Sequence, residues 1–177
     1  MRKVIDLTRE IYTGMMVYPG DPEVKIIQSH NIAEHGYKVS RLVFGSHNST
    51  HVDAQSHMVE DGKTLSDYGV DRFIGDALYV RRPDDIAQSE VLVVDGPKFN
   101  DSLIERIIAI SPKMVGFVLD NDLDEEGVGK FLKEDILPVG PLNIREALPD
   151  KFLFVATPLN IRYGDGSPVR AIAITYE

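Results

Sequence analysis

The sequence predicts a single α/β domain, and three observations support this prediction. The chain has 177 residues, enough for one well-filled core, so a second domain is not required. Strand-like segments outnumber helical ones and the two kinds interleave along the chain. No internal repeat or low-complexity linker divides the sequence, and its 43% hydrophobic and 27% charged residues are ordinary for a soluble globular protein.

The strand predictions rest on short runs rich in valine, isoleucine, leucine and tyrosine. Within residues 37–44, Val39, Arg41 and Val43 stand at alternate positions, which is the spacing of side chains on one face of a strand. Two stretches rich in glycine and proline, residues 18–22 and 164–168, are predicted to be loops. The predicted strands are residues 4–7, 24–28, 37–44, 76–81, 91–95, 114–119, 152–157 and 169–176.

Residues 100–110 give the clearest helix prediction. Asn100 or Asp101 can cap the amino terminus, and apolar residues recur behind it at helical spacing. A second helix is predicted for residues 124–135, where two glycines weaken the pattern, and a helical turn for residues 143–148. The apolar stripe of the first helix is Leu103, Ile104, Ile107 and Ile108.

The charge balance excludes several classes of partner. A net charge of −9 repels nucleic-acid phosphates and anionic lipid, and no apolar stretch approaches the length of a transmembrane helix, so we expect neither nucleic acid nor membrane as a partner. The absence of cysteine excludes thiolate ligands, disulfides and a cysteine nucleophile. Because the start of the sequence also lacks the apolar run of a signal peptide, a cytoplasmic location is the default expectation.

Four residues carry the functional signal: His47, His51, Asp53 and His57, in the pattern His-x3-His-x-Asp-x3-His. Three of the five histidines of the chain lie in this pattern. Imidazole and carboxylate are the ligands that Zn²⁺ and Mn²⁺ prefer, so the pattern indicates a metal site. The competing interpretation is a group of polar residues on a solvated loop, which the clustering disfavours.

A metal site requires the chain to bend within this pattern. A straight strand would aim all four side chains at one face, but would separate its ends by about 33 Å. Asn48 and Ser49 are turn-prone residues. A bend there would bring His47 back toward His51 and Asp53.

The same segment resembles the signature of the metal-dependent cyclase/hydrolase family, which includes bacterial kynurenine formamidases and isatin hydrolases. That signature is His-x-Gly-Thr-His-x-Asp-x-Pro-x-His, and the chain keeps all four ligand-type residues. Ser49 and Gln55 stand where the signature has glycine and proline. The resemblance extends to both ends of the chain, through residues 5–8 and 18–22 and through residues 158–161 and 164–171.

The resemblance implies a cyclase-like swivelling β/β/α fold: a mixed, β-rich, barrel-like sheet with flanking helices over residues 1–177. It also implies assembly as a homodimer or higher homo-oligomer, and hydrolysis of a small amide, formamide or lactam. The resemblance also implies one or two divalent cations. By position, His47, His51 and Asp53 would bind the first of them. His57 would be a further ligand or the catalytic base.

One departure from the family weakens the case for two cations. Family members generally add a downstream histidine and then a glutamate, but this chain has no histidine after His57 and the glutamate position falls at Val139 or Gly140. We therefore expect one ion, Zn²⁺ or Mn²⁺, per chain. Three explanations remain open: a one-ion site, a substitute carboxylate, or a metal- or ligand-binding protein that has lost turnover. The candidate substitutes are Asp120, Asp122 and Asp165.

For an enzyme, these residues predict a metal-dependent hydrolase of carbon–nitrogen bonds other than peptide bonds. His57 is the expected acid/base, since an imidazole pKa near 6.5 suits both roles. Tyr18 either covers an aromatic substrate or simply forms the turn it belongs to. Arg170 either holds a substrate carboxylate or has a structural role in its strand. A serine nucleophile is the weaker alternative, because no Gly-x-Ser-x-Gly elbow is present.

Overall fold

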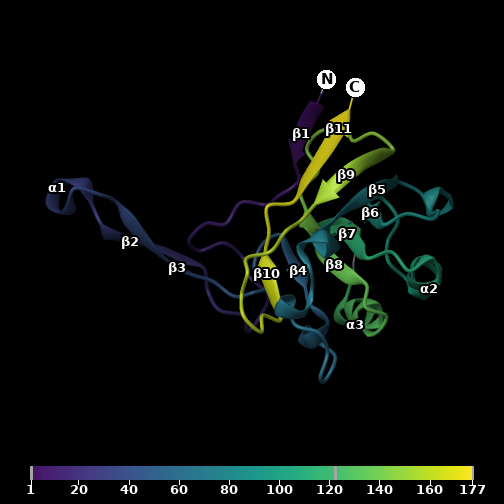
Figure 1. Cartoon of the computed structure of the whole chain (residues 1–177), viewed down its shortest axis with the longest axis horizontal. Helices are drawn as coiled ribbons and strands as arrows, with labels where there is room; N and C mark the ends of the chain where they lie inside the picture. Colours follow the sequence, from purple (N-terminus) through teal and green to yellow (C-terminus); the bar gives the residue numbers. More distant parts are fainter. Residues whose placement is uncertain (1, 122, 177) are drawn as a thin grey trace.

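A computed structural model describes residues 2–121 and 123–176 (Figure 1). In this part of the chain, nine strands form one mixed sheet in the order β1-β11-β9-β5-β6-β7-β8-β4-β10, and β2 and β3 form a separate two-stranded sheet. The strands are β1 (Arg2–Asp6), β2 (Lys25–His30), β3 (Val39–Val43), β4 (His51–Asp53), β5 (Ile74–Val80), β6 (Val91–Val94), β7 (Met114–Val118), β8 (Leu137–Leu142), β9 (Lys151–Val155), β10 (Gly166–Pro168) and β11 (Ile172–Tyr176).

The centre of the large sheet is parallel, from β5 through β6 and β7 to β8, and the strands flanking it are antiparallel. Strand β6 is an unbroken Val-Leu-Val-Val run in which every residue is buried. Such runs are typical of parallel strands that are covered on both faces. Among the described residues, the α-helices are α1 (Ile32–His35), α2 (Asp101–Ile110) and α3 (Glu125–Lys133), and the 3₁₀ helices are η1 (Gln55–His57), η2 (Leu65–Asp67), η3 (Val70–Phe73), η4 (Pro83–Asp85) and η5 (Leu119–Asn121).

Helices α2 and α3 cover one face of the parallel strands. Asn100 caps α2 by accepting a hydrogen bond from the backbone N–H of Leu103, and Asp124 caps α3 in the same way. Leu103, Ile104 and Ile107 are buried as predicted. They pack with strand residues in one apolar cluster, and a larger cluster fills the opposite, curled face of the sheet.

Strand β4 positions the predicted metal ligands. It lies between β8 and β10, antiparallel to both. His51 pairs with Gly140 of β8, while Asp53 pairs with Gly166 of β10. Residues far apart in the sequence therefore meet beside the His-Asp pattern.

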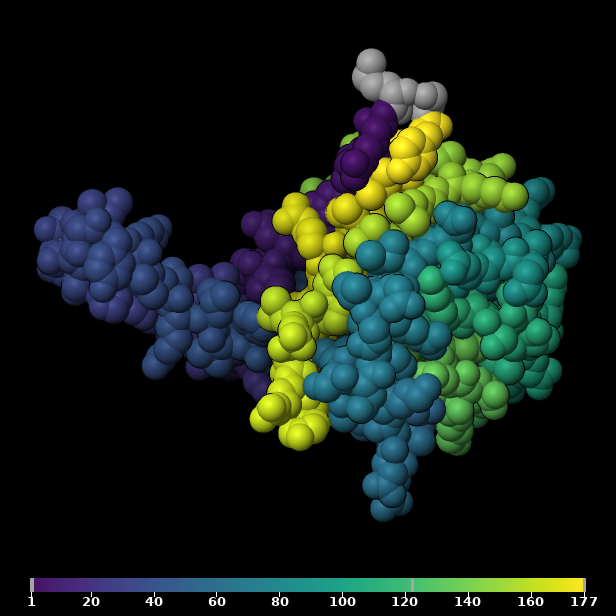
Figure 2. Space-filling view, in the orientation of Figure 1, coloured from purple at the N-terminus to yellow at the C-terminus, as the bar shows by residue number. Residues whose placement is uncertain are grey.

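The second sheet forms an arm. Strands β2 and β3 pair only with each other and project from the body of the molecule, with α1 at the tip (Figures 1 and 2). Almost every residue of the two strands is exposed.

The predicted fold class, an α/β domain with a mixed, barrel-like sheet and flanking helices, is confirmed. Two local expectations were wrong: residues 143–148 form no helical turn, and residues 164–168, predicted to be a loop, contain β10. Strands β4 and β8 were not predicted. Strands β8 and β10 contain proline and glycine, which conceal a strand pattern in a sequence. Within residues 2–121 and 123–176, no helix has the length and apolar character needed to cross a membrane.

Candidate metal centre

The His-Asp pattern begins with the bend that the sequence predicts. Asn48 accepts a hydrogen bond at its Oδ1 from the backbone N–H of Gly45 at 2.6 Å. Ser49 has φ of 60°, and its hydroxyl donates to the carbonyl of Arg9 at 2.8 Å. A positive φ favours glycine, which is the residue that the signature has at this position. Serine adopts it here with the help of a hydrogen bond that glycine lacks.

The bend gathers His47, His51 and Asp53 into one cluster. Oδ1 of Asp53 lies 2.8 Å from Nδ1 of His47 and 3.2 Å from Nε2 of His51. One donor atom from each of the three residues lies within 4.8 Å of the other two. Two imidazoles and a carboxylate at this spacing fit a divalent cation such as Zn²⁺ or Mn²⁺.

Asp53 is a buried carboxylate whose negative charge must be balanced by a positive charge within the cluster. It is only 4% exposed, and a buried carboxylate needs a charged partner or a cation. Burial raises the pKa of Asp53, but the charge of His51 and hydrogen bonds to both histidines hold that pKa well below its usual range. The carboxylate is therefore ionised and its charge is directed at the two imidazoles.

His51 is oriented for metal binding by the backbone. Its Nδ1 lies 2.9 Å from the carbonyl oxygen of Ser49, an acceptor that places the proton on Nδ1. Nε2, which lies 3.2 Å from Oδ1 of Asp53, is the nitrogen left to face a cation. A ligating histidine is usually held by such a bond through its other nitrogen. Thr50 does not contact the imidazole: its buried hydroxyl donates to the carbonyl of Pro141 at 2.7 Å and fixes the backbone.

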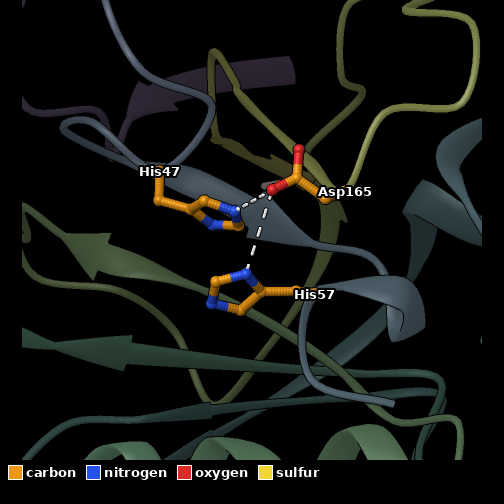
Figure 3. A group of neighbouring side chains, drawn as sticks. All are labelled: His47, His57 and Asp165. Atoms are coloured by element: carbon orange, nitrogen blue, oxygen red, sulfur yellow. Dashed lines mark hydrogen bonds and ion pairs between the residues drawn. The ribbon is translucent and has the colours of Figure 1, made fainter. Parts of the chain in front are cut away.

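His57 belongs to a second, overlapping group with His47 and Asp165 (Figure 3). It lies on η1, the 3₁₀ turn directly after β4, and its Nδ1 is 3.9 Å from Oδ2 of Asp165. The rings of His47 and His57 are 3.8 Å apart between centroids, at an angle of 31°. His57 is thus beside the cluster of His51 and Asp53, in a separate group of potential ligands.

The pKa values of His47 and His57 are shifted in opposite directions. Burial alone would lower the pKa of His47, but hydrogen bonds and charges from Asp53 and Asp165 raise it to about 9. Burial and the neighbouring charge of His47 lower the pKa of His57. Of the two neighbouring rings, His47 is therefore the protonated, positively charged one, and His57 is neutral at pH 7.

His47, His51 and His57 line a cavity of about 850 Å³. Phe117, Leu123 and Val128 supply apolar walls. Tyr18, an exposed residue of the lining, donates a hydrogen bond to Oε1 of Glu125 at 2.5 Å. The remaining lining residues are Pro19, Asp21, His47, His51, His57, Met58, Asp124, Glu125 and Glu126.

The other predicted substrate residue lies elsewhere. Arg170 holds Asp6 through two hydrogen bonds, at 3.0 and 2.6 Å, and lines a different cavity of about 660 Å³. Tyr18, in contrast, shares the cavity of the histidines. Of the candidate substitute carboxylates, Asp165 joins a metal-type group and Asp120 does not, while Asp122 lies outside the described residues.

The sequence indicates Asp165 only as one of three candidate carboxylates, in a predicted loop, and it does not single out Glu125 or Glu126. Asp165 reaches His47 because β10 pairs with β4, a register that no local pattern reveals. The two glutamates line the cavity because α3 begins there.

Comparison with known proteins finds similar sequences and similar structures. Residues 5–105 match the family described as "Putative cyclase". A kynurenine formamidase from Salinibacter ruber is 26% identical over 203 residues, covering 96% of each chain, and one from Bacillus cereus is 24% identical over 205 residues, covering 95% of each. The structure of an isatin hydrolase bound to the product analogue thioisatinate superimposes with a TM-score of 0.82 at 18% identity, covering 99% of this chain and 93% of the other.

The resemblance to the cyclase/hydrolase family is therefore confirmed, and with it the predicted enzyme class, a hydrolase of carbon–nitrogen bonds other than peptide bonds. The match to the family covers more than half of the sequence and includes the whole His-Asp pattern. The chain belongs to the cyclase family.

Proposed function

We propose that this protein is a metal-dependent hydrolase of a small amide, formamide or lactam. The observation that carries the proposal is the cluster of His47, His51 and Asp53 beside a cavity with apolar walls. Relatives named kynurenine formamidase and a structural neighbour named isatin hydrolase support a carbonyl–nitrogen substrate. The cytoplasmic location expected from the sequence is kept as part of the proposal.

Three residues would hold one cation, Zn²⁺ or Mn²⁺. His47 and Asp53 would bind it from the bend and from β4, and His51 through its Nε2. When bound, such a cation supplies a Lewis acid that lowers the pKa of water and polarises a carbonyl. Its positive charge also balances the buried carboxylate of Asp53, which in the metal-free protein is balanced by the imidazoles.

His57 would move the proton. Its lowered pKa leaves the imidazole neutral at pH 7, so it can accept a proton from the attacking water. As the carbon–nitrogen bond breaks, His57 returns that proton to the leaving nitrogen, and the hydroxyl remains on the carbonyl carbon. Its side chain is 34% exposed and lines the cavity, so it is accessible to a bound substrate.

The cavity would select the substrate by shape and apolar contact. Phe117, Leu123 and Val128 offer a surface for an aromatic or aliphatic group. Tyr18 is 62% exposed and would cover a substrate from the mouth, held in place by Glu125. Arg170 is not included, because its guanidinium is engaged by Asp6 at another cavity.

The test is hydrolysis by metal-loaded protein. Chelator-treated protein is reloaded with Zn²⁺ or Mn²⁺ and assayed against a panel of aryl formamides, lactams and simple amides. We expect metal-dependent turnover that His51→Ala abolishes and that His30→Ala retains, since His30 lies in the arm. Metal binding without turnover on any substrate class would contradict the proposal and favour a metal- or ligand-binding role.

A further inference from the structure

We propose that Asp165 is a positioning residue that holds His47 in the tautomer and orientation required for metal binding. This inference rests on the proposed metal site and assigns a role to a residue outside its three ligands. Oδ2 of Asp165 lies 2.9 Å from Nε2 of His47 (Figure 3). Nδ1 of the same ring lies 2.8 Å from Oδ1 of Asp53. One imidazole thus stands between two carboxylates.

The two contacts define separate tasks for the two ring nitrogens. A neutral imidazole has one N–H and one lone pair, so a ring that ligates through Nδ1 carries its proton on Nε2. The proton on Nε2 then needs an acceptor, and Asp165 provides one. A carboxylate behind a ligating histidine fixes its tautomer and strengthens it as a ligand. His51 receives the equivalent support from the carbonyl of Ser49.

The backbone holds Asp165 in this position. Its carbonyl accepts a hydrogen bond from the N–H of Ala54 at 2.9 Å, and the next residue, Gly166, pairs with Asp53 in the ladder between β10 and β4. Ser46 donates a further hydrogen bond to Oδ2 of Asp165 at 3.3 Å. The carboxylate is therefore fixed relative to the ligand strand itself.

The other neighbour of β4 offers no comparable group. On β8, Val139 and Gly140 pair with Val52 and His51, and neither carries a polar side chain. The ring of Phe117 lies where a Cβ on Gly140 would point, at 2.7 Å. Of the two strands that flank the ligands, only β10 brings a carboxylate to them.

Direct ligation by Asp165, with His47 and His57, is the competing arrangement. Charge favours the positioning role. The side chain of Asp165 is 50% exposed and is already satisfied by the N–H of His47, whereas that of Asp53 is only 6% exposed and requires compensation. A single cation is therefore best placed beside Asp53, with Asp165 behind His47.

The test measures metal affinity and the Co²⁺ absorption spectrum of the folded protein. The dissociation constants of Zn²⁺ and Co²⁺ are determined by competition with a chromophoric chelator for wild type, Asp165→Ala and Asp165→Asn. We expect Asp165→Ala to weaken binding by about 10–100-fold with the visible Co²⁺ bands at unchanged wavelength. Asp165→Asn retains an oxygen acceptor and is expected to lie between wild type and Asp165→Ala.

A matched control is Asp84→Ala, which removes a carboxylate on η4, outside the site. Wild-type affinity in Asp165→Ala would overturn the positioning role and leave the proposed function intact. Shifted Co²⁺ bands would overturn it in favour of direct ligation. Absence of Zn²⁺ and Co²⁺ binding in wild type would overturn both this inference and the proposed metal site.

Discussion

Gly166 pairs with Asp53 across the ladder of β4 and β10, at a point where a Cβ on residue 166 would lie 2.5 Å from Cε1 of His47. The absence of a side chain at this position is what allows the histidine to lie against the strand that carries Asp53. The geometry of the candidate metal centre thus depends on a residue with no ligand chemistry.

Gly166→Ala is therefore expected to displace His47. The new methyl group would also lie 2.9 Å from the carbonyl of Val52, so the strand pair must separate or the ring must move. We expect a loss of about 1–3 kcal/mol in unfolding free energy and at least tenfold weaker Zn²⁺ binding, measured by urea unfolding and chelator competition.

Gly129→Ala is the control for this substitution. Gly129 lies inside α3, where the added Cβ meets nothing closer than 3.8 Å. Alanine is favoured over glycine in a helix by about 0.5–1 kcal/mol, so this variant is expected to be more stable than wild type with unchanged metal affinity. Equal effects of the two substitutions would contradict the steric argument.

His57→Gln separates proton transfer from metal binding. His57 is not in the group formed by His47, His51 and Asp53, so the variant is expected to keep its cation. Loss of an acid/base residue lowers the turnover number by about 10²–10⁴-fold. Turnover of the metal-loaded variant and its metal content, measured on the same sample, test this prediction; loss of the metal would instead make His57 a ligand.

Asp135 predicts a pH dependence of stability away from the metal centre. Burial raises the pKa of Asp135. Hydrogen bonds from Lys63 and Tyr68 and the charge of Arg72 together lower it by more than burial raises it, so the pKa is below the usual 3.8. The stabilisation of the folded protein by the ionised Asp135 carboxylate is therefore complete above the pKa that this group has in the unfolded chain. It is lost as the pH falls through the pKa that the group has in the folded protein. At pH 7, we expect Asp135→Asn to reduce the free energy of unfolding by about 1–3 kcal/mol.

Urea unfolding of both proteins at pH 7 and at pH 3 measures this effect. Asparagine tolerates the positive φ of 56° at this position, so the comparison isolates the charge. The difference between wild type and Asp135→Asn is expected to shrink at pH 3. A difference that is constant with pH would show that the carboxylate charge contributes nothing.

The cap of α2 gives a simpler stability prediction. Asn100 accepts the N–H of Leu103 at 2.9 Å, and removing an N-cap residue costs about 1 kcal/mol. Asn100→Ala is expected to lower the unfolding free energy by that amount, while Ser102→Ala, at an exposed position of the same helix, is expected to change it little. Thermal and urea unfolding measure both.

Local patterns in the sequence were sufficient for much of the fold. The apolar run of β6 and the capped stripe of α2 are visible without a structure, because burial and helical spacing leave a direct trace. Strands β8 and β10 are not visible, since proline and glycine break their patterns and only pairing with β4 makes them strands.

In the candidate site, too, some features follow from local sequence and others depend on tertiary structure. The His-Asp pattern and its bend at Ser49 are local, so the sequence predicts them. The contact between His47 and Asp165 joins residues 118 positions apart, and it depends on strand register. The placement of Arg170 against Asp6 depends on tertiary structure in the same way.

The metal content of the protein tests the central claim most directly. Protein purified in the presence of Zn²⁺ or Mn²⁺, then dialysed, is analysed for bound metal alongside His51→Ala and the arm variant His30→Ala. We predict about one ion per chain in wild type and His30→Ala, and none in His51→Ala. Wild-type protein without bound metal, or His51→Ala with a full complement, would contradict the assignment of His47, His51 and Asp53 as a metal centre.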